Sequence, residues 1–133
     1  MTTPSGRPEH LLVVEDNPGD SRLIEEGFRE AGSEATLHVV PTGEEALDFV
    51  HRRGEYETAP EPDLILLDWN LPATDGEGLL AEIQAAFDDV PVAIMTGSQA
   101  TEEAIRAVAP DAAAYLTKPT EPTAYVDLVR SIF

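Results

Sequence analysis

Short apolar runs alternate along the chain with segments in which apolar residues recur every three or four positions. The runs have five or six residues without regular polar alternation, which is typical of strands covered on both faces of a parallel sheet. The segments between them have the spacing of helices that bury one apolar face. The pattern predicts strands at 10–14, 35–40, 63–67, 90–95 and 112–116. It predicts helices at 18–31, 43–53, 79–87, 104–108 and 125–132.

Cap and turn residues mark several boundaries. Asn17 can cap the first helix, and Pro18 suits the first helical position because its missing N–H would be unpaired there anyway. Thr42 and Glu45 fit a capping box at the start of the second helix. The polar, turn-rich stretch 54–62 is predicted to be a loop.

Strands that alternate with helices define the fold class. Parallel strands need crossover helices, so we expect an α/β fold: a doubly wound five-stranded parallel sheet with helices on both faces. Residues 1–8, MTTPSGRP, are small and polar and are expected to be a flexible N-terminal tail. Residues 9–133 suit one domain with one core, and we expect no effector domain.

The charge balance narrows the choice of partners. The chain has 26 Asp and Glu against 8 Lys and Arg, a formal net charge of −18, yet 42% of its residues are hydrophobic. Nucleic acid and anionic membranes both need a basic face, so neither is an expected partner. Seven of the eight basic residues are Arg, and the only lysine is Lys118. This composition is typical of proteins from high-salt cytoplasms, so we expect a halophilic cytoplasmic protein; the alternative is an acidic docking face for a basic partner.

Cysteine and histidine offer no obvious chemistry. The chain has no cysteine, which excludes disulfides and thiolate metal sites. No apolar run is long enough to span a membrane, and no basic-then-apolar leader precedes the fold. His10, His38 and His51 have no metal-binding spacing and are interpreted as structural or surface residues.

Polar residues follow the predicted strands, at the edge where ligands bind in parallel α/β sheets. Clustered carboxylates repel one another, and a bound cation would relieve that repulsion. Oxygen ligands without His or Cys favour Mg²⁺, which leaves room for a phosphate oxygen. The residues therefore predict phosphoryl transfer to a carboxylate, assisted by a lysine and a hydroxyl. The strand-end residues are Glu15, Asp16, Asp68, Thr96, Thr117 and Lys118.

Four segments in order resemble the receiver domain of two-component response regulators: LLVVEDNPGDSRLI, DLILLDWNLPATDGEGLL, VAIMTGS and AAAYLTKP. The resemblance covers residues 10–133 and implies the flavodoxin-like (βα)5 fold with strand order 2-1-3-4-5. The first segment and the long loop at 54–62 are most similar to stand-alone regulators, which include partners of bacterial phytochromes.

The resemblance implies the roles of the site residues. Asp68 would be the phosphoacceptor, and Lys118 and Thr96 would bind the phosphoryl oxygens. The ligands of Mg²⁺ or Mn²⁺ would be Glu15, Asp16, Asp68 and the backbone carbonyl of Asn70.

The resemblance also implies two residues that switch conformation and two residues that set the rate of dephosphorylation. Thr96 and Tyr115 would change conformation on phosphorylation, although Tyr115 is also interpretable as a half-buried strand tyrosine. Asn70 and Ser98 would flank the water that attacks the phosphoryl group and so tune dephosphorylation. The Lys118–Pro119 peptide bond would be cis.

These features predict a single-domain response regulator, phosphorylated by a histidine kinase or a phosphotransfer protein. It would be no enzyme beyond its own aspartyl phosphorylation and dephosphorylation. Phosphorylation would alter the face made by the fourth helix, fifth strand and fifth helix, where a downstream protein or a second copy binds. One alternative is an interaction module that does not use phosphate. The other is a phosphatase with an aspartate nucleophile, which needs a second Asp as general acid where this chain has Asn70.

Overall fold

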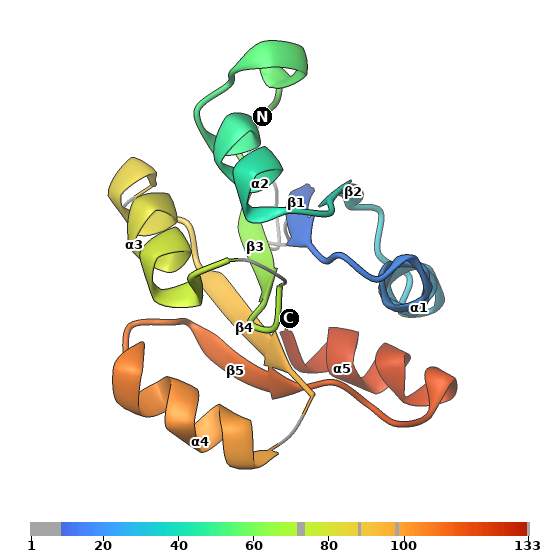
Figure 1. The fold of residues 1–133 in the computed structure, drawn as a ribbon. Helices are drawn as coiled ribbons and strands as arrows, with labels where there is room; N and C mark the ends of the chain where they lie inside the picture. Colours follow the sequence, from blue (N-terminus) through green and yellow to red (C-terminus); the bar gives the residue numbers. More distant parts are fainter. Residues whose placement is uncertain (1–8, 72–73, 88, 98, 133) are drawn as a thin grey trace.

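The computed structural model describes residues 9–71, 74–87, 89–97 and 99–132, with the backbone alone for 99–101. The predicted tail at 1–8 lies outside this range. Five parallel strands form one sheet in the order β2-β1-β3-β4-β5, which confirms the doubly wound α/β fold (Figure 1). The strands are β1 (His10–Val14), β2 (Thr36–Val40), β3 (Leu64–Asp68), β4 (Val92–Thr96) and β5 (Ala114–Thr117).

Helices cover both faces of the sheet (Figure 1). The helices are α1 (Pro18–Glu30), α2 (Gly43–Val50), α3 (Gly76–Ala86), α4 (Gln99–Val108) and α5 (Tyr125–Ile132), with 3₁₀ turns η1 (Gly54–Tyr56) and η2 (Pro122–Ala124). Successive strand residues point to opposite faces, so Leu11 and Val13 pack towards α1 and α5, whereas Leu12 and Val14 pack towards α2, α3 and α4.

No helix among the described residues is both long enough and apolar enough to cross a bilayer.

The strands differ in how deeply they are buried. Every residue of β3 and β4 is buried, as is every residue of β1 after the first. Every residue of β5, at one edge of the sheet, is only half-buried. The centre of the sheet therefore gives a rigid base to the residues that follow β1, β3 and β4.

The predicted caps of α1 and α2 are present. Asn17 Oδ1 accepts hydrogen bonds from the backbone N–H groups of Gly19 at 2.8 Å and Asp20 at 3.2 Å. Thr42 Oγ1 accepts one from the N–H of Glu45 at 3.0 Å. The cap of α1 fixes its first turn directly after β1, at the same edge of the sheet as the other strand ends.

β1 has the predicted boundaries, and the boundaries of the other strands differ from the prediction by one or two residues. Asp63 lies outside β3, and its Oδ2 accepts bonds from the N–H groups of Glu9 at 2.8 Å and His10 at 2.9 Å. β3 therefore runs on to Asp68, which becomes its last residue. β4 begins only after Pro91, which has no N–H to donate, and ends at Thr96.

Helix boundaries also differ from the sequence pattern: α2 ends at Val50 instead of 53, and α3 begins at Gly76 instead of 79. α4 begins at Gln99 instead of 104, because apolar periodicity marks only the buried stripe of a helix. The predicted loop at 54–62 contains η1, and its Tyr56 ring packs 5.5 Å from the Phe49 ring. An aromatic contact with α2 therefore orders part of this loop.

Candidate functional site

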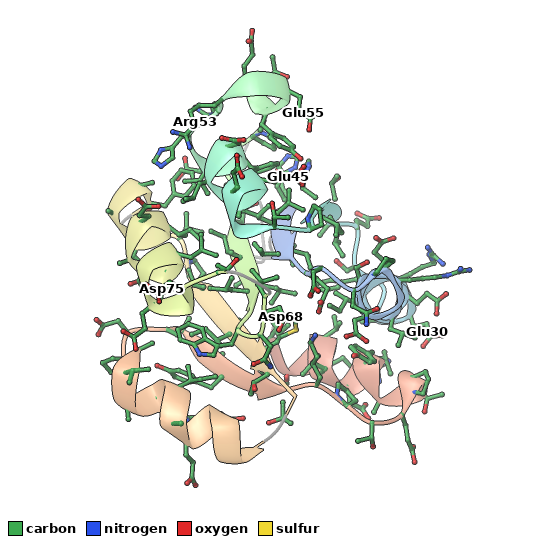
Figure 2. All side chains as sticks on the ribbon, viewed as in Figure 1. Glu30, Glu45, Arg53, Glu55, Asp68 and Asp75 are labelled. Atoms are coloured by element: carbon green, nitrogen blue, oxygen red, sulfur yellow. The ribbon has the colours of Figure 1, made fainter. Side chains whose placement is uncertain are left out.

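Three carboxylates converge where β1 and β3 end. Val14 and Leu67 are partners in adjacent strands, so the residues that follow them emerge side by side. One oxygen from each of Glu15, Asp16 and Asp68 lies within 4.8 Å of the others. Glu15 and Asp68 are 2% and 3% exposed, Asp16 is exposed, and Figure 2 shows Asp68 at the end of its strand. The structure thus brings together the three carboxylates that the sequence selected.

Lys118 links this cluster to the first turn of α1. Its Nζ lies 2.6 Å from Glu15 Oε1, 3.1 Å from Asp20 Oδ2 and 3.3 Å from Asp68 Oδ2. Its backbone N–H donates to the carbonyl of Thr96 at 2.7 Å, which ties the end of β5 to β4. One ammonium therefore faces several carboxylates in a largely buried setting.

Burial sets the protonation of the cluster. Desolvation raises the pKa of Glu15 to about 7; the hydrogen bond from Lys118 opposes this shift, and Asp68 adds to it. Desolvation alone would lower the pKa of Lys118, but the hydrogen bond to Glu15 and the charge of Asp68 outweigh it and raise that pKa. Lys118 is therefore charged at neutral pH, while Glu15 is near the midpoint of its titration. Added positive charge would favour the ionised form of Glu15.

The Thr96 hydroxyl is an unsatisfied group at the end of β4. The residue is 1% exposed, and its Oγ1 has no hydrogen-bond partner in the described part of the chain. Buried polar atoms are almost always paired, so an unpaired hydroxyl on the strand beside that of Asp68 is suited to an oxygen of a ligand. The all-oxygen carboxylate set likewise fits a hard divalent cation.

The turn after β3 wraps around the Asp68 carboxylate. The N–H of Asn70 donates to Asp68 Oδ1 at 3.0 Å, and the N–H of Trp69 donates to the carbonyl of Met95 at 2.9 Å. Asn70 is thus adjacent to the cluster, while a metal-binding role for its carbonyl stays a prediction. Ser98, the other predicted tuning residue, lies outside the described residues.

The prediction of a cis peptide bond between Lys118 and Pro119 is wrong for this structure. The described residues contain no cis peptide bond, so this bond is trans. The trans form of an X–Pro bond is favoured by about 0.5–1 kcal/mol unless the fold selects the cis form. Lys118 reaches its three carboxylate partners with the bond trans.

Tyr115 belongs to a different group of side chains, between α4 and β5. Its hydroxyl donates to the carbonyl of Ala109, and the Arg106 guanidinium lies 4.4 Å from the centre of its ring. Glu102 pairs with Arg106 at 3.1 Å and accepts a hydrogen bond from Thr117 Oγ1 at 2.8 Å. The predicted switch residue is thus held against α4 by polar contacts.

Asp20 is a site residue that the sequence reasoning missed. It lies in the first turn of α1, and its half-buried carboxylate pairs with Lys118. The sequence signal was partial: the cap predicted at Asn17 places the first turn of α1 at the ligand-binding edge of the sheet, but it does not say which side chain of that turn faces Lys118.

Fold and site together describe a doubly wound α/β domain with a carboxylate cluster at the carboxyl edge of its sheet, and comparison with known proteins identifies its family. The model of the response regulator receiver domain matches residues 11–130, so the chain belongs to that family. The response regulator Rcp1 of Synechocystis is 38% identical over 120 residues, which cover 89% of this chain and 82% of Rcp1.

Solved structures agree with this assignment. The phosphorylated cyanobacterial phytochrome response regulator RcpA superposes with a TM-score of 0.82 at 32% identity, covering 95% of this chain and 91% of RcpA. The Mn²⁺-bound form of Rcp1 gives 0.79 at 36% identity, covering 94% of this chain and 91% of that one. The predicted similarity to phytochrome-partnered regulators is confirmed by the likeness to RcpA.

Proposed function

We propose that this response regulator accepts a phosphoryl group on Asp68 from a histidine kinase or a phosphotransfer protein, in a reaction that depends on Mg²⁺ or Mn²⁺. The supporting observation is the buried Asp68 carboxylate, which lies 3.3 Å from Lys118 and within 4.8 Å of two further acidic side chains. The Mn²⁺-bound structure of Rcp1 supports the choice of metal.

The protein residues would divide the chemistry among them. An Asp68 oxygen forms the new P–O bond while the P–N bond to the donor histidine breaks, and the electron pair stays on the donor nitrogen. Lys118 then turns from Asp68 Oδ2 to a phosphoryl oxygen while Glu15 and Asp20 still hold its ammonium. A cation held by Glu15, Asp16, Asp68 and the Asn70 carbonyl would neutralise charge on the transferring group.

The signal would start at Thr96. Its unpaired hydroxyl donates to a phosphoryl oxygen, and the space this movement leaves lets Tyr115 turn inward, away from Ala109 and Arg106. The α4-β5-α5 face then changes shape and binds a downstream protein or a second copy. NMR of wild type and Asp68→Asn with a phosphoryl mimic tests this step; unchanged Tyr115 signals in wild type would refute it.

Asn70 and Ser98 would set the lifetime of the phosphorylated state, since they lie two residues after Asp68 and Thr96. Substitutions at either position are expected to change the dephosphorylation rate several-fold. Unchanged rates in both variants would exclude this role.

Labelling with acetyl phosphate tests the acceptor directly. Wild type is expected to gain one acid-stable, hydroxylamine-sensitive phosphoryl group in Mg²⁺ and none in EDTA, and Asp68→Asn is expected to gain none. Asp111→Asn is the matched control, because Asp111 is exposed on the loop before β5. Persistent labelling of Asp68→Asn would contradict the proposal, and a protein that never labels would favour an interaction module without phosphate.

The remaining proposals concern context. The protein would act in the cytoplasm, where its kinase finds ATP, and would catalyse only its own phosphorylation and dephosphorylation. Aryl phosphate turnover is not expected, since Asn70 replaces the acid such a phosphatase needs. The charge of −18 would be an adaptation to high salt, so molar KCl should raise the melting temperature by screening repulsion.

A further inference from the structure

Two histidines that are far apart in the sequence meet on neighbouring strands. His10 opens β1 and His38 lies on β2, where it pairs with Leu12, two residues after His10. Both side chains therefore lie on the same face of the sheet. His10 Nδ1 is 3.2 Å from His38 Nε2, the ring centroids are 5.4 Å apart, and both residues are half-buried.

This separation is one that two metal ligands adopt. Nitrogens bound at about 2.0–2.1 Å to one ion, with an angle of about 90–110° between them, lie about 2.9–3.4 Å apart. Metal binding also needs neutral imidazole, and burial, together with the charge of His10, lowers the pKa of His38. The sheet thus holds two imidazole nitrogens near chelating distance.

The surroundings hold one ring in place and leave space beside it. The His38 ring packs 5.2 Å from the Phe49 ring, which restricts its orientation. A cavity of about 350 Å³ borders the His38 side of the pair and is also lined by Glu55 and Tyr56, while His10 is not among its lining residues. Glu55, on η1, lies well away from Asp68 (Figure 2), and the net charge of −18 attracts cations to the surface.

We propose that His10 and His38 form a second, bidentate metal site, for an ion that imidazole prefers, such as Ni²⁺, Zn²⁺ or Cu²⁺, completed by water. The ion joins β1 to the edge strand β2. The proton that the two facing nitrogens share moves to the distal nitrogen of its own ring, so both lone pairs bind the metal and no proton is lost. Mg²⁺ prefers oxygen, so the histidine site and the carboxylate cluster take different ions.

Ni²⁺ titration of the whole chain tests the site, with millimolar Mg²⁺ present to occupy the carboxylates. Isothermal titration calorimetry is expected to show one Ni²⁺ site that His10→Gln and His38→Gln each weaken at least tenfold. His51→Gln, at an exposed histidine outside the pair, and Asp68→Asn should both keep wild-type affinity. Ni²⁺ at ten times its Kd should raise the melting temperature of wild type by roughly 3–5 °C. Unchanged affinity in both pair variants, or loss in either control, overturns the proposal.

A second measurement does not depend on the folding of any variant. Paramagnetic Ni²⁺ added to wild type should broaden the imidazole NMR signals of His10 and His38 before those of His51. Broadening that starts at His51 would mean surface binding and would overturn the proposal.

Discussion

The carboxylate cluster around Lys118 and the α4–β5 contact around Tyr115 are both groups of polar side chains, and they differ sharply in burial. Glu15, Asp68 and Thr96 are 2%, 3% and 1% exposed and lie at the ends of β1, β3 and β4, in which every residue except His10 is buried. The Arg106 side chain is 55% exposed and contacts a strand that is half-buried throughout. The reacting groups are thus fixed, whereas the groups proposed to transmit the signal lie where local rearrangement costs least.

The energetic roles of the two regions differ in the same way. A buried charge without a partner is strongly destabilising, so Lys118 is indispensable to the fold around Glu15 and Asp68 in the absence of a cation. Exposed ion pairs and cation–π contacts contribute about 0–1 kcal/mol each. The α4–β5 contacts can therefore exchange for others when one phosphoryl group is added.

Matched leucine truncations give the largest expected effect. Leu67 is 0% exposed at the centre of the sheet, and Leu116 is half-buried on β5. Leu67→Ala should lower the free energy of unfolding by about 3 kcal/mol and Leu116→Ala by about 1 kcal/mol, because the cavity at the edge is partly open to water. Urea denaturation measures both; equal losses would show that β5 is as rigid as the core.

Lys118→Arg tests the cluster itself. Guanidinium keeps the charge but is planar and larger, so it should not make the three close contacts of the ammonium, and the phosphorylation rate should fall at least about tenfold. The control is Arg22→Lys, at a surface side chain that is 81% exposed. A wild-type phosphorylation rate in Lys118→Arg would show that any positively charged side chain at position 118 supports the reaction and that the lone lysine is incidental.

Residues that directly follow the strands were predictable from the sequence. Apolar runs locate buried strands, and parallel strands end at a common edge, so Glu15, Asp68 and Lys118 followed from pattern alone. Strand boundaries were less certain, because Asp63 leaves β3 through side-chain bonds that periodicity does not encode.

Contacts that depend on orientation were not predictable. Asp20 reaches Lys118 only because the Asn17 cap sets the direction of α1, and His10 meets His38 only through the register of β1 with β2. The resemblance implies a cis bond between Lys118 and Pro119, and the bond is trans in this structure. In each case the outcome depends on tertiary geometry that residue spacing does not contain.

The pH dependence of the free energy of unfolding measures the cost of burying the Glu15 carboxylate. Its pKa is raised from 4.5 to about 7, so between these values the native state holds a proton that the unfolded state has lost. Stability should therefore fall as pH rises through that window, by about 1–2 kcal/mol in EDTA. Urea denaturation at pH 5 and 7 measures the fall, which Glu15→Gln should reduce and Mg²⁺ should offset by favouring the ionised form. An identical fall in Glu15→Gln would assign it to general surface repulsion.

Removing Arg106 should have the smallest effect on stability and a clear effect on signalling. Arg106 and Arg22 each pair with a glutamate four residues away on an exposed helix face, but only Arg106 also covers an aromatic ring, that of Tyr115. Arg106→Ala and Arg22→Ala should both change the free energy of unfolding by less than about 1 kcal/mol. Arg106→Ala alone should shift the Tyr115 ring signals of the unphosphorylated protein towards those seen with a phosphoryl mimic, because one contact that holds the ring outward is gone. The size of that shift measures the equilibrium between the outward and the inward position of the Tyr115 ring. If Arg106→Ala leaves the Tyr115 signals unchanged, the hydrogen bond from the Tyr115 hydroxyl to the Ala109 carbonyl is the contact that holds the ring against α4.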